Sequence, residues 1–200
     1  MKQTWSWTHV LIVAGTFLGT LHWYDRLPAS IPVHWNFRGL IDGYGPRSFI
    51  YGIPVLMLLL QTLPALATRG ASSSVHAITT GILAFFACLQ AVIIAAAMGK
   101  NPDVIRLVCA GISLLIMFLG RQMPGLPRNY WVGIRTPWTL TSDYVWQETH
   151  RRAEQAMRWG GLAGAALTLT PWPWLGLIAA AGGVIYPVYD SWRISGGAPR

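Results

Sequence analysis

The chain has 200 residues, of which 53% are hydrophobic and only 11% are charged, with 15 Lys and Arg against 7 Asp and Glu. Because soluble domains carry about 25% charged residues, this composition excludes a disordered chain, a small disulfide-stapled fold and almost any soluble enzyme. The net charge of +8 does not indicate nucleic-acid binding, since no recognition motif accompanies it. We predict an integral membrane protein.

The first apolar segment, Trp7–Tyr24, approaches the roughly 20 residues that a helix needs to cross a bilayer. It is too long for the core of a signal peptide, and no small-residue cleavage site follows it. We therefore predict a membrane helix that the mature protein keeps.

The loop that follows, residues 25–48, is unusually long for a turn between two membrane helices. Pro28 and Pro32 favour extended backbone before them, and Gly39, Gly43 and Gly45 permit tight turns. This outer loop is therefore expected to run extended across the membrane face.

Short polar side chains stand among the aromatic residues of this loop. One interpretation is a small polar site for a peptide, a lipid headgroup or a metal ion; the other is an ordered loop whose polar side chains cap its turns. One histidine with one carboxylate falls short of the three or four ligands of a zinc site, so we predict no metal. The candidate binding residues are His34, Asn36, Gly39, Asp42 and Tyr44.

The same loop carries a recognisable motif. LPASIPVHWNFRGLIDGYGPR resembles the pattern LP-x-x-IP-x-H-(W/F)-N-x-x-G-x-x-D-x-(Y/W) of a small domain of unknown function. That domain commonly opens proteins of the SdpI type, which are bacterial membrane proteins named for immunity against a secreted toxin.

Three further apolar segments follow, at residues 49–67, 75–98 and 104–120. Pro54 and Pro64 are tolerated or kink the first of them, as lipid-embedded helices allow. Arg106 lies close enough to the start of the third to snorkel to the interface. Cys88 and Cys109 lie within apolar stretches and indicate packing rather than metal or redox chemistry.

The inner loop, residues 121–157, has two halves. Its second half is predicted to be a helix that Ser142 or Asp143 caps, that places Trp146 and His150 on one stripe with Ala153 and Met157, and that runs on into the next span with a bend at Gly160-Gly161.

Its first half mixes polar and aromatic residues. It is either a binding surface for a protein or an anionic group, with Arg135 as the donor, or an interfacial segment with Arg135 on a lipid phosphate. The candidate residues of the inner loop are Asn129, Gly133, Arg135, Thr136, Pro137, Trp138, Thr139, Trp146, His150 and Arg151.

This loop carries a second motif. RNYWVGIRTPWTLTSDYVWQETHR resembles the SdpI-type signature P-N-(Y/F)-x-x-G-(I/V)-R-(T/L)-PW-T followed by W-x-x-(T/A)-H-R, with Arg128 where proline or another residue often precedes the asparagine. Both motifs, in the expected order, identify the chain as a member of the SdpI-type family. The resemblance implies that the outer loop meets a toxin and that the inner loop holds a transcriptional repressor at the membrane.

The last apolar segment, residues 159–189, is split by Pro171-Trp172-Pro173-Trp174, where a helix must break. Small residues on both arms favour close helix packing. The predicted fold is an all-α integral membrane protein with about six transmembrane helices, a structured outer loop and a longer, partly helical inner loop. Its regions are residues 1–70, 71–120 and 121–200.

The orientation follows from the distribution of basic residues. Ten of the 15 Lys and Arg lie on the side of the N-terminus and five on the other. This favours a multi-pass protein of the plasma membrane with both termini in the cytoplasm. The ten are Lys2, Arg69, Arg121, Arg128, Arg135, Arg151, Arg152, Arg158, Arg193 and Arg200, and the five are Arg26, Arg38, Arg47, Lys100 and Arg106.

An enzyme or lipid-handling protein is the competing hypothesis, with His34 as general base and Asp42 orienting it. Against it, His34 and His150 fall on opposite membrane faces, and no nucleophile elbow or metalloprotease motif is present. A transporter ranks third, because the spans hold almost no ionisable residues away from their ends. We predict no catalytic residue, no cofactor and no direct nucleic-acid contact; the expected partners are membrane lipid, a secreted toxin outside and a small repressor inside.

Overall fold

The computed structural model describes residues 6–62 and 73–196. Its helices are α1 (Trp7–Tyr24), α2 (Gly52–Leu60), α4 (Ser73–Ala97), α5 (Val104–Gln122), α6 (Pro137–Thr141), α7 (Asp143–Leu167) and α8 (Leu175–Ile194), with 3-10 turns η1 (Arg47–Tyr51) and η2 (Met123–Gly125). The end of the segment predicted at 49–67 lies outside the described residues, as do Lys2, Arg69 and Arg200.

The prediction of an all-α fold is wrong in the outer loop. There, β1 (Ser30–Trp35) and β2 (Ile41–Pro46) pair as an antiparallel hairpin. The extended backbone was expected, but the pairing of its two halves was not. The fold is therefore mainly helical with one two-stranded sheet.

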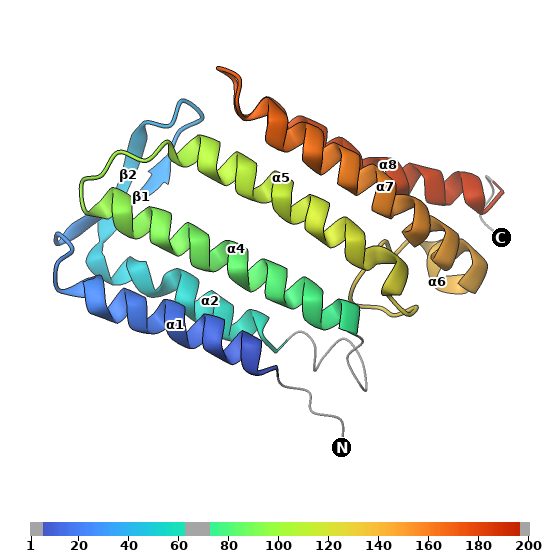
Figure 1. The fold of residues 1–200 in the computed structure, drawn as a ribbon, viewed down its shortest axis with the longest axis horizontal. Coiled ribbons are helices and arrows are strands. Elements are labelled where there is room, and N and C mark those ends of the chain that lie inside the picture. The colour runs from blue at the N-terminus through green and yellow to red at the C-terminus, as the bar shows by residue number, and fades with distance from the viewer. Residues whose placement is uncertain (1–5, 63–72, 197–200) are drawn as a thin grey trace.

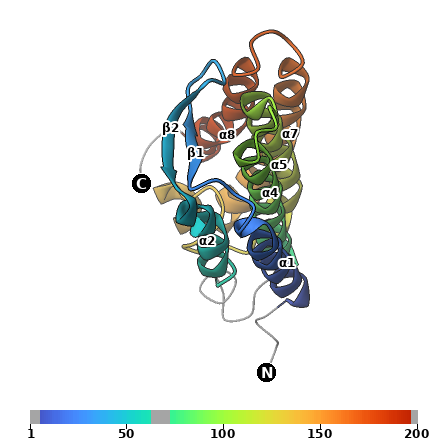
Figure 2. The same ribbon diagram turned by 90° about the vertical axis from the view of Figure 1, so that its left-hand side faces the viewer.

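Taken in chain order, α1, α2, α4, α5, α7 and α8 run alternately in opposite directions along the long axis of the molecule (Figure 1). α1, α4, α5 and α7 form a row in which each helix packs on the next, α2 packs on α1 and α4, and α8 packs on α5 and α7. This alternation places the β-hairpin and the α7–α8 loop at one end of the bundle, called here the hairpin end, and residues 123–142 with α6 at the other, the platform end. Figure 2 looks onto the hairpin end.

Two described helical segments are long and apolar enough to cross a membrane, Ser73–Ala97 and Val104–Gly125, whereas the apolar run Arg47–Leu60 is shorter. These two helices match the segments predicted at 75–98 and 104–120. The crossing of all six predicted spans stays a prediction.

Glycines allow α7 to pack closely against both of its neighbours. A Cβ on Gly160 would lie 2.8 Å from the Cα of Gly183 in α8, and one on Gly161 would lie 2.6 Å from the carbonyl oxygen of Ser113 in α5. The predicted role of small residues is therefore confirmed at these positions. Gly182 differs, because a Cβ there would meet nothing within 4 Å.

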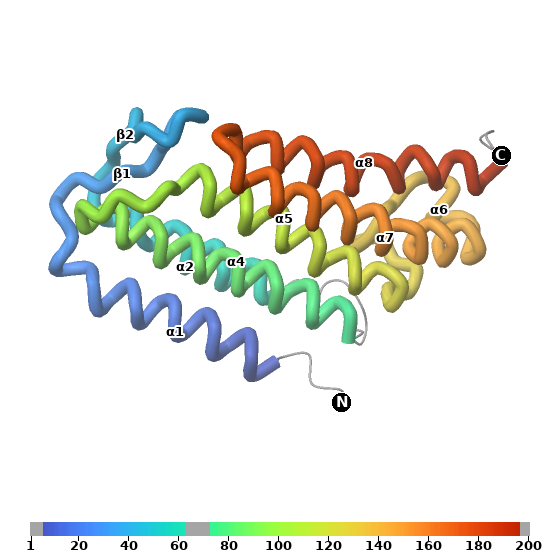
Figure 3. Tube along the Cα trace, turned by 45° about the horizontal axis from the view of Figure 1, so that its top comes forward, coloured from blue at the N-terminus to red at the C-terminus, as the bar shows by residue number. Residues whose placement is uncertain are grey.

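The two arms of the C-terminal segment lie side by side (Figure 3). α7 ends at Leu167 and α8 begins at Leu175, so the break predicted at Pro171–Trp174 is present. α7 itself is one uninterrupted helix from Asp143, without a helix break at Gly160-Gly161.

Candidate functional site

The β-hairpin presents one exposed ionisable pair. Nδ1 of His34 lies 2.5 Å from Oδ1 of Asp42, and the two side chains are 71% and 42% exposed. The pair joins facing strands, since His34 is in β1 and Asp42 in β2. With Nδ1 held by the carboxylate, Nε2 of His34 is the ring nitrogen that faces other groups.

Asn36 stabilises the turn of the same hairpin. Its Oδ1 accepts hydrogen bonds from the backbone N–H groups of Arg38 at 2.9 Å and Leu40 at 3.1 Å, and so closes the turn between the strands. Gly39 in that turn has a φ of +78°, which suits glycine. Of the five predicted outer residues, the structure therefore joins His34 to Asp42, gives Asn36 and Gly39 to the turn, and leaves Tyr44 64% exposed.

At the platform end, the inner loop is organised by His150. The backbone N–H of Ile134 donates to Nε2 of His150 at 3.0 Å, so Nδ1 carries the proton and donates to the carbonyl of Trp146 at 2.7 Å. The His150 ring stacks on Trp146 with 4.1 Å between the ring centroids. Burial lowers the pKa of His150, although its hydrogen bond to Trp146 opposes that shift.

Gly133 provides the close approach that this arrangement needs. Its φ is +113°, and a Cβ there would lie 2.5 Å from Nε2 of His150. Trp146 is 1% exposed and donates through Nε1 to the carbonyl of Leu126 at 2.8 Å. The loop before Ile134 is thus closed over the first turns of α7.

Three further groups of hydrogen bonds complete this region. Asn129 accepts from the backbone N–H groups of Trp131 and Val132, both at 2.8 Å. Thr136 and Thr139 form a reciprocal capping box at the start of α6, where Pro137 follows the cap residue. Trp138 donates through Nε1 to Oγ of Ser191 at 2.7 Å. This hydrogen bond joins α6 to the last turns of α8.

Two predicted basic residues stay on the surface of this region. Arg135 is exposed and donates from Nη1 to the carbonyl of Tyr130 at 2.7 Å. Arg151 and Arg152 both contact Glu148, whose pKa these hydrogen bonds lower to about 2. The inner-loop platform, defined as residues 126–152, therefore has a hydrogen-bonded, buried interior and arginines on its exterior.

The predicted residues thus separate into two groups at opposite ends of the bundle. Within residues 6–62 and 73–196, no three His, Cys, Asp or Glu side chains gather in a way that could hold a metal ion. The His34–Asp42 pair and the platform share no contact, and Figure 1 places the hairpin and α6 far apart along the long axis.

Comparisons with known proteins agree with this division. The profile of the SdpI/YfhL protein family matches residues 125–189, and that of a domain of unknown function, DUF1648, matches residues 11–58. The chain therefore carries an SdpI/YfhL region preceded by a DUF1648 region. The DUF1648 region contains α1 from residue 11 onward, the β-hairpin and most of α2, whereas the SdpI/YfhL region contains the platform, α7 and most of α8. The chain is a membrane protein, as its similarity to this family and its apolar helices support.

One curated protein to which the chain is similar is "Immunity protein SdpI" of Bacillus subtilis (strain 168). It is 24% identical over 152 residues, which cover 74% of this chain and 73% of the relative. No solved structure matches the chain.

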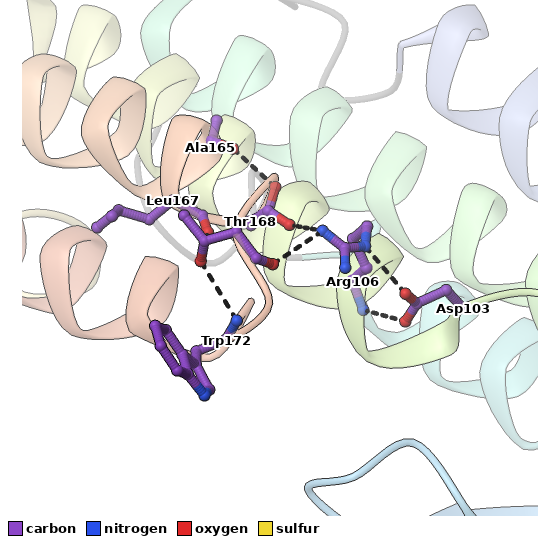
Figure 4. Close-up of polar contacts among 7 residues, drawn as sticks. Asp103, Arg106, Ala165, Leu167, Thr168 and Trp172 are labelled. Carbon is purple, nitrogen blue, oxygen red and sulfur yellow. Dashed lines mark hydrogen bonds and ion pairs between the residues drawn. The ribbon is translucent and has the colours of Figure 1, made fainter.

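The sequence interpretation missed a set of hydrogen bonds from an arginine in α5 to the SdpI/YfhL region. Arg106, at the start of α5, contacts the carboxylate of Asp103 and the backbone carbonyls of Thr168 and Thr170 in the α7–α8 loop (Figure 4). Arg106 was predicted only to snorkel. The sequence did show a cation near the end of an apolar segment. It did not show the partners of that cation, because they lie 62 and 64 residues further along the chain.

Asp190 was also missed. Its side chain is 2% exposed, and Oδ2 lies 3.4 Å from Nη1 of Arg152. Asp190 and Ser191 are adjacent, so the end of α8 holds the platform through both an ion pair and the bond from Trp138. Neither residue belongs to a recognisable motif.

Proposed function

We propose that this chain is a multi-pass membrane immunity protein that protects a bacterial cell from a secreted, membrane-active toxin and passes the presence of that toxin to a cytoplasmic repressor. The hairpin end meets the toxin, and the inner-loop platform meets the repressor. Both termini lie in the cytoplasm.

The observation that carries this proposal is the separation of two built surfaces by the length of the helical bundle. The exposed His34–Asp42 pair is at one end. At the other end, exposed Arg135 directly follows Ile134, whose backbone N–H is bonded to buried His150. A binding protein that responds on one membrane face to an event on the other needs such an arrangement. The name of the Bacillus relative supports the immunity role.

The orientation rests on charge. Arg128, Arg135, Arg151 and Arg152 belong to the platform, and a surplus of Lys and Arg favours the cytoplasmic side. Arg106 at the hairpin end is already neutralised by Asp103 at 2.9 Å.

Labelling of single cysteines tests the topology. In a background with Cys88→Ala and Cys109→Ala, Phe37→Cys and Tyr130→Cys offer matched positions, since the two native side chains are 76% and 73% exposed. An impermeant maleimide should label Phe37→Cys in intact cells and Tyr130→Cys only after lysis. The reverse pattern would exchange the two partner assignments.

Protection is tested in a B. subtilis strain from which the gene for Immunity protein SdpI has been removed. This strain is exposed to culture medium from the parent strain or from toxin-producing relatives of the parent strain. Expression of this chain should raise survival. Full sensitivity at normal protein levels in the membrane would remove the immunity role toward that toxin.

One observation favours a second candidate function, a lipid-handling or hydrolytic protein. The His34–Asp42 pair has the geometry in which a carboxylate orients an imidazole base. An enzyme would need one integrated site, so His34→Ala should then abolish turnover of an added phospholipid substrate, whereas the immunity proposal expects no turnover in either protein.

A further inference from the structure

A pocket of about 530 Å³ opens between α7 and α8, a size within the range of roughly 300 to 1,000 Å³ of small-ligand pockets. The two helices lie side by side (Figure 3), and Gly160 and Gly183 line the pocket where they pack closely. Arg152 and Asp190 line its end toward the platform. Because α7 and α8 line this α7–α8 pocket, only its charged end belongs to the platform.

The α7–α8 pocket opens onto the outer surface of the bundle. Trp159 and Tyr186 line it and are 60% and 51% exposed, and a Cβ added at Gly182 would meet nothing within 4 Å. α7 and α8 contain the last two predicted spans, and lipid covers the outer surface of a span. Trp and Tyr are enriched at the level of the lipid headgroups. Lipid is therefore the molecule that this pocket meets in a membrane.

A buried carboxylate in the pocket provides an independent indication of a ligand. Asp190 is 2% exposed, and its Oδ2 accepts one long hydrogen bond of 3.4 Å from Nη1 of Arg152. Its Oδ1 has no partner among the residues that the structure describes, and it is not one of their fully enclosed unpaired atoms. This oxygen can therefore be reached from the pocket that Asp190 lines. Because a buried charge is costly unless it is paired, the carboxylate favours a ligand with a hydrogen-bond donor.

The charged groups at this end of the pocket cancel. Arg151 bonds Glu148 through Nε and Nη2, and Arg152 bonds Glu148 through Nε and Asp190 through Nη1. Two arginines thus stand against two carboxylates. Nη1 of Arg151 and Nη2 of Arg152 have no partner within the described ranges, and both arginines line the pocket. A site with separated charges and no net charge suits a zwitterion, with its anion on the arginines and its cation on Asp190.

These requirements separate the common phospholipids. Phosphatidylglycerol and cardiolipin carry phosphate without a cation, so they leave Asp190 with its single long hydrogen bond. The quaternary ammonium of phosphatidylcholine has no N–H to donate. Phosphatidylethanolamine has a primary ammonium beside its phosphate, and such a group, like that of lysine, carries three donors. Its headgroup matches both the carboxylate and the arginines.

We propose that the α7–α8 pocket binds phosphatidylethanolamine. The ammonium donates to Oδ1 of Asp190, the phosphate accepts from Arg151 and Arg152, and an acyl chain lies along Tyr186 and over Gly182. This inference rests on the multi-pass topology proposed above, and it does not depend on toxin protection.

The test uses the full-length protein in detergent with equal amounts of dioleoyl phosphatidylethanolamine and dioleoyl phosphatidylglycerol. Native mass spectrometry measures the lipid that stays bound. The protein should retain about tenfold more phosphatidylethanolamine, the ratio that one hydrogen bond to a charged group provides. Dioleoyl phosphatidylcholine should bind no better than phosphatidylglycerol.

Two substitutions separate the ammonium contact from the phosphate contact. Asp190→Asn keeps an acceptor for Arg152 but removes the charge, so the ratio of the two lipids should fall to about one. Arg151→Gln removes a donor to the phosphate, which both lipids carry, and should weaken both alike while the ratio is kept.

Gly182→Leu fills the pocket from its open side. It should fold, because the added side chain meets no neighbour and leucine is the better helix former; an unchanged thermal midpoint verifies this. Binding of both lipids should fall about tenfold, the order of the cost of crowding a filled site. Gly52→Leu is the matched control, since Gly52 of α2 is equally open, and it should leave lipid binding unchanged.

Three results would overturn the proposal. These are equal retention of the two lipids by the unsubstituted protein, an unchanged preference in folded Asp190→Asn, and unchanged retention in folded Gly182→Leu. Displacement of the lipid by water-soluble glycerophosphoethanolamine would assign the site to a free headgroup instead, and dimers that Gly182→Leu separates would assign it to a second copy of the chain. The cysteine labelling described above tests the topology by itself, so a wrong topology and a wrong ligand give different results.

Discussion

The backbone N–H of Ile134 and the imidazole of His150 form a hydrogen bond of 3.0 Å in which Nε2 of the ring is the acceptor. The bond requires a neutral ring, since a protonated Nε2 would turn its hydrogen toward that of Ile134. His150 is 1% exposed, and burial holds its pKa below the usual value of 6.5. The inner-loop platform therefore depends on an uncharged histidine.

Stability should accordingly fall as the pH drops. The unfolded chain binds the proton near pH 6.5 and the folded chain only below that, so the stabilisation is complete above pH 6.5 and is lost as the pH falls further. Thermal unfolding between pH 7.5 and 5 should show a decreasing midpoint. His150→Gln should flatten this dependence, and His34→Ala should not; a flattened profile in His34→Ala would assign the effect to the hairpin.

Gly133→Ala should destabilise the protein more than Gly99→Ala. Both glycines have positive φ, of 113° and 77°, but a Cβ at Gly99 meets nothing within 4 Å whereas one at Gly133 collides with His150. Gly99→Ala should cost about 1 kcal/mol for backbone strain, and Gly133→Ala at least about 1 kcal/mol more. Denaturation in detergent compares them, and equal losses would mean that the loop moves away from His150 without penalty.

Asn36→Ala should lower the stability of the protein, whereas His34→Ala should affect toxin protection. Removing Asn36 leaves two backbone N–H groups of the hairpin turn without their acceptor, which should cost about 1 to 2 kcal/mol. His34 forms an exposed ion pair, whose loss costs about 1 kcal/mol or less. We expect His34→Ala to keep its folded level and lose toxin protection. A loss of stability with protection intact per folded molecule would make the pair structural.

Arg135→Lys should separate signalling from protection. Lysine keeps the charge but not the planar fork of donors that suits a carboxylate or phosphate. Repressor capture, measured with a reporter gene, should fall while survival is kept, and His34→Ala should show the reverse. Arg121→Lys is a matched control on an exposed arginine outside the platform. Equal loss of both readouts in both variants would contradict two separate surfaces.

Arg152→Ala should cost more stability than Arg151→Ala. Both arginines pair with Glu148, but only Arg152 also reaches Asp190, which is 2% exposed. Loss of its partner leaves a buried carboxylate unsatisfied, at a cost of about 1 to 3 kcal/mol, whereas Arg151 forms an exposed ion pair that contributes little to stability. Chemical denaturation measures the difference, and similar values would show that Asp190 finds another donor.

Much of the platform could be predicted from local sequence. Helical spacing placed Trp146 and His150 on one stripe with Ala153 and Met157, and all four are buried. Ser142 caps α7 as expected, since its Oγ accepts from the N–H of Val145. Capping and periodicity act within a few residues, so a sequence displays them directly.

The β-hairpin and the long-range ties could not be predicted in the same way. Pro32 in β1 and Gly43 in β2 weaken the alternation that signals a strand, and a Cβ at Gly43 would lie 2.8 Å from that of His34. The bond from Trp138 to Ser191 spans 53 residues. Such contacts depend on how α6 and α8 meet, which no local pattern encodes.

The unbroken course of α7 bears on which molecules can reach the platform. Its 25 residues give a rod of about 38 Å, longer than the roughly 30 Å of hydrocarbon in a bilayer. If α7 crosses the membrane, about 8 Å of it remains outside the hydrocarbon, which is about five residues from Asp143 onward. Residues 126–142, which are attached to that first turn, then lie at the level of the lipid headgroups or beyond them, where a water-soluble protein can reach them.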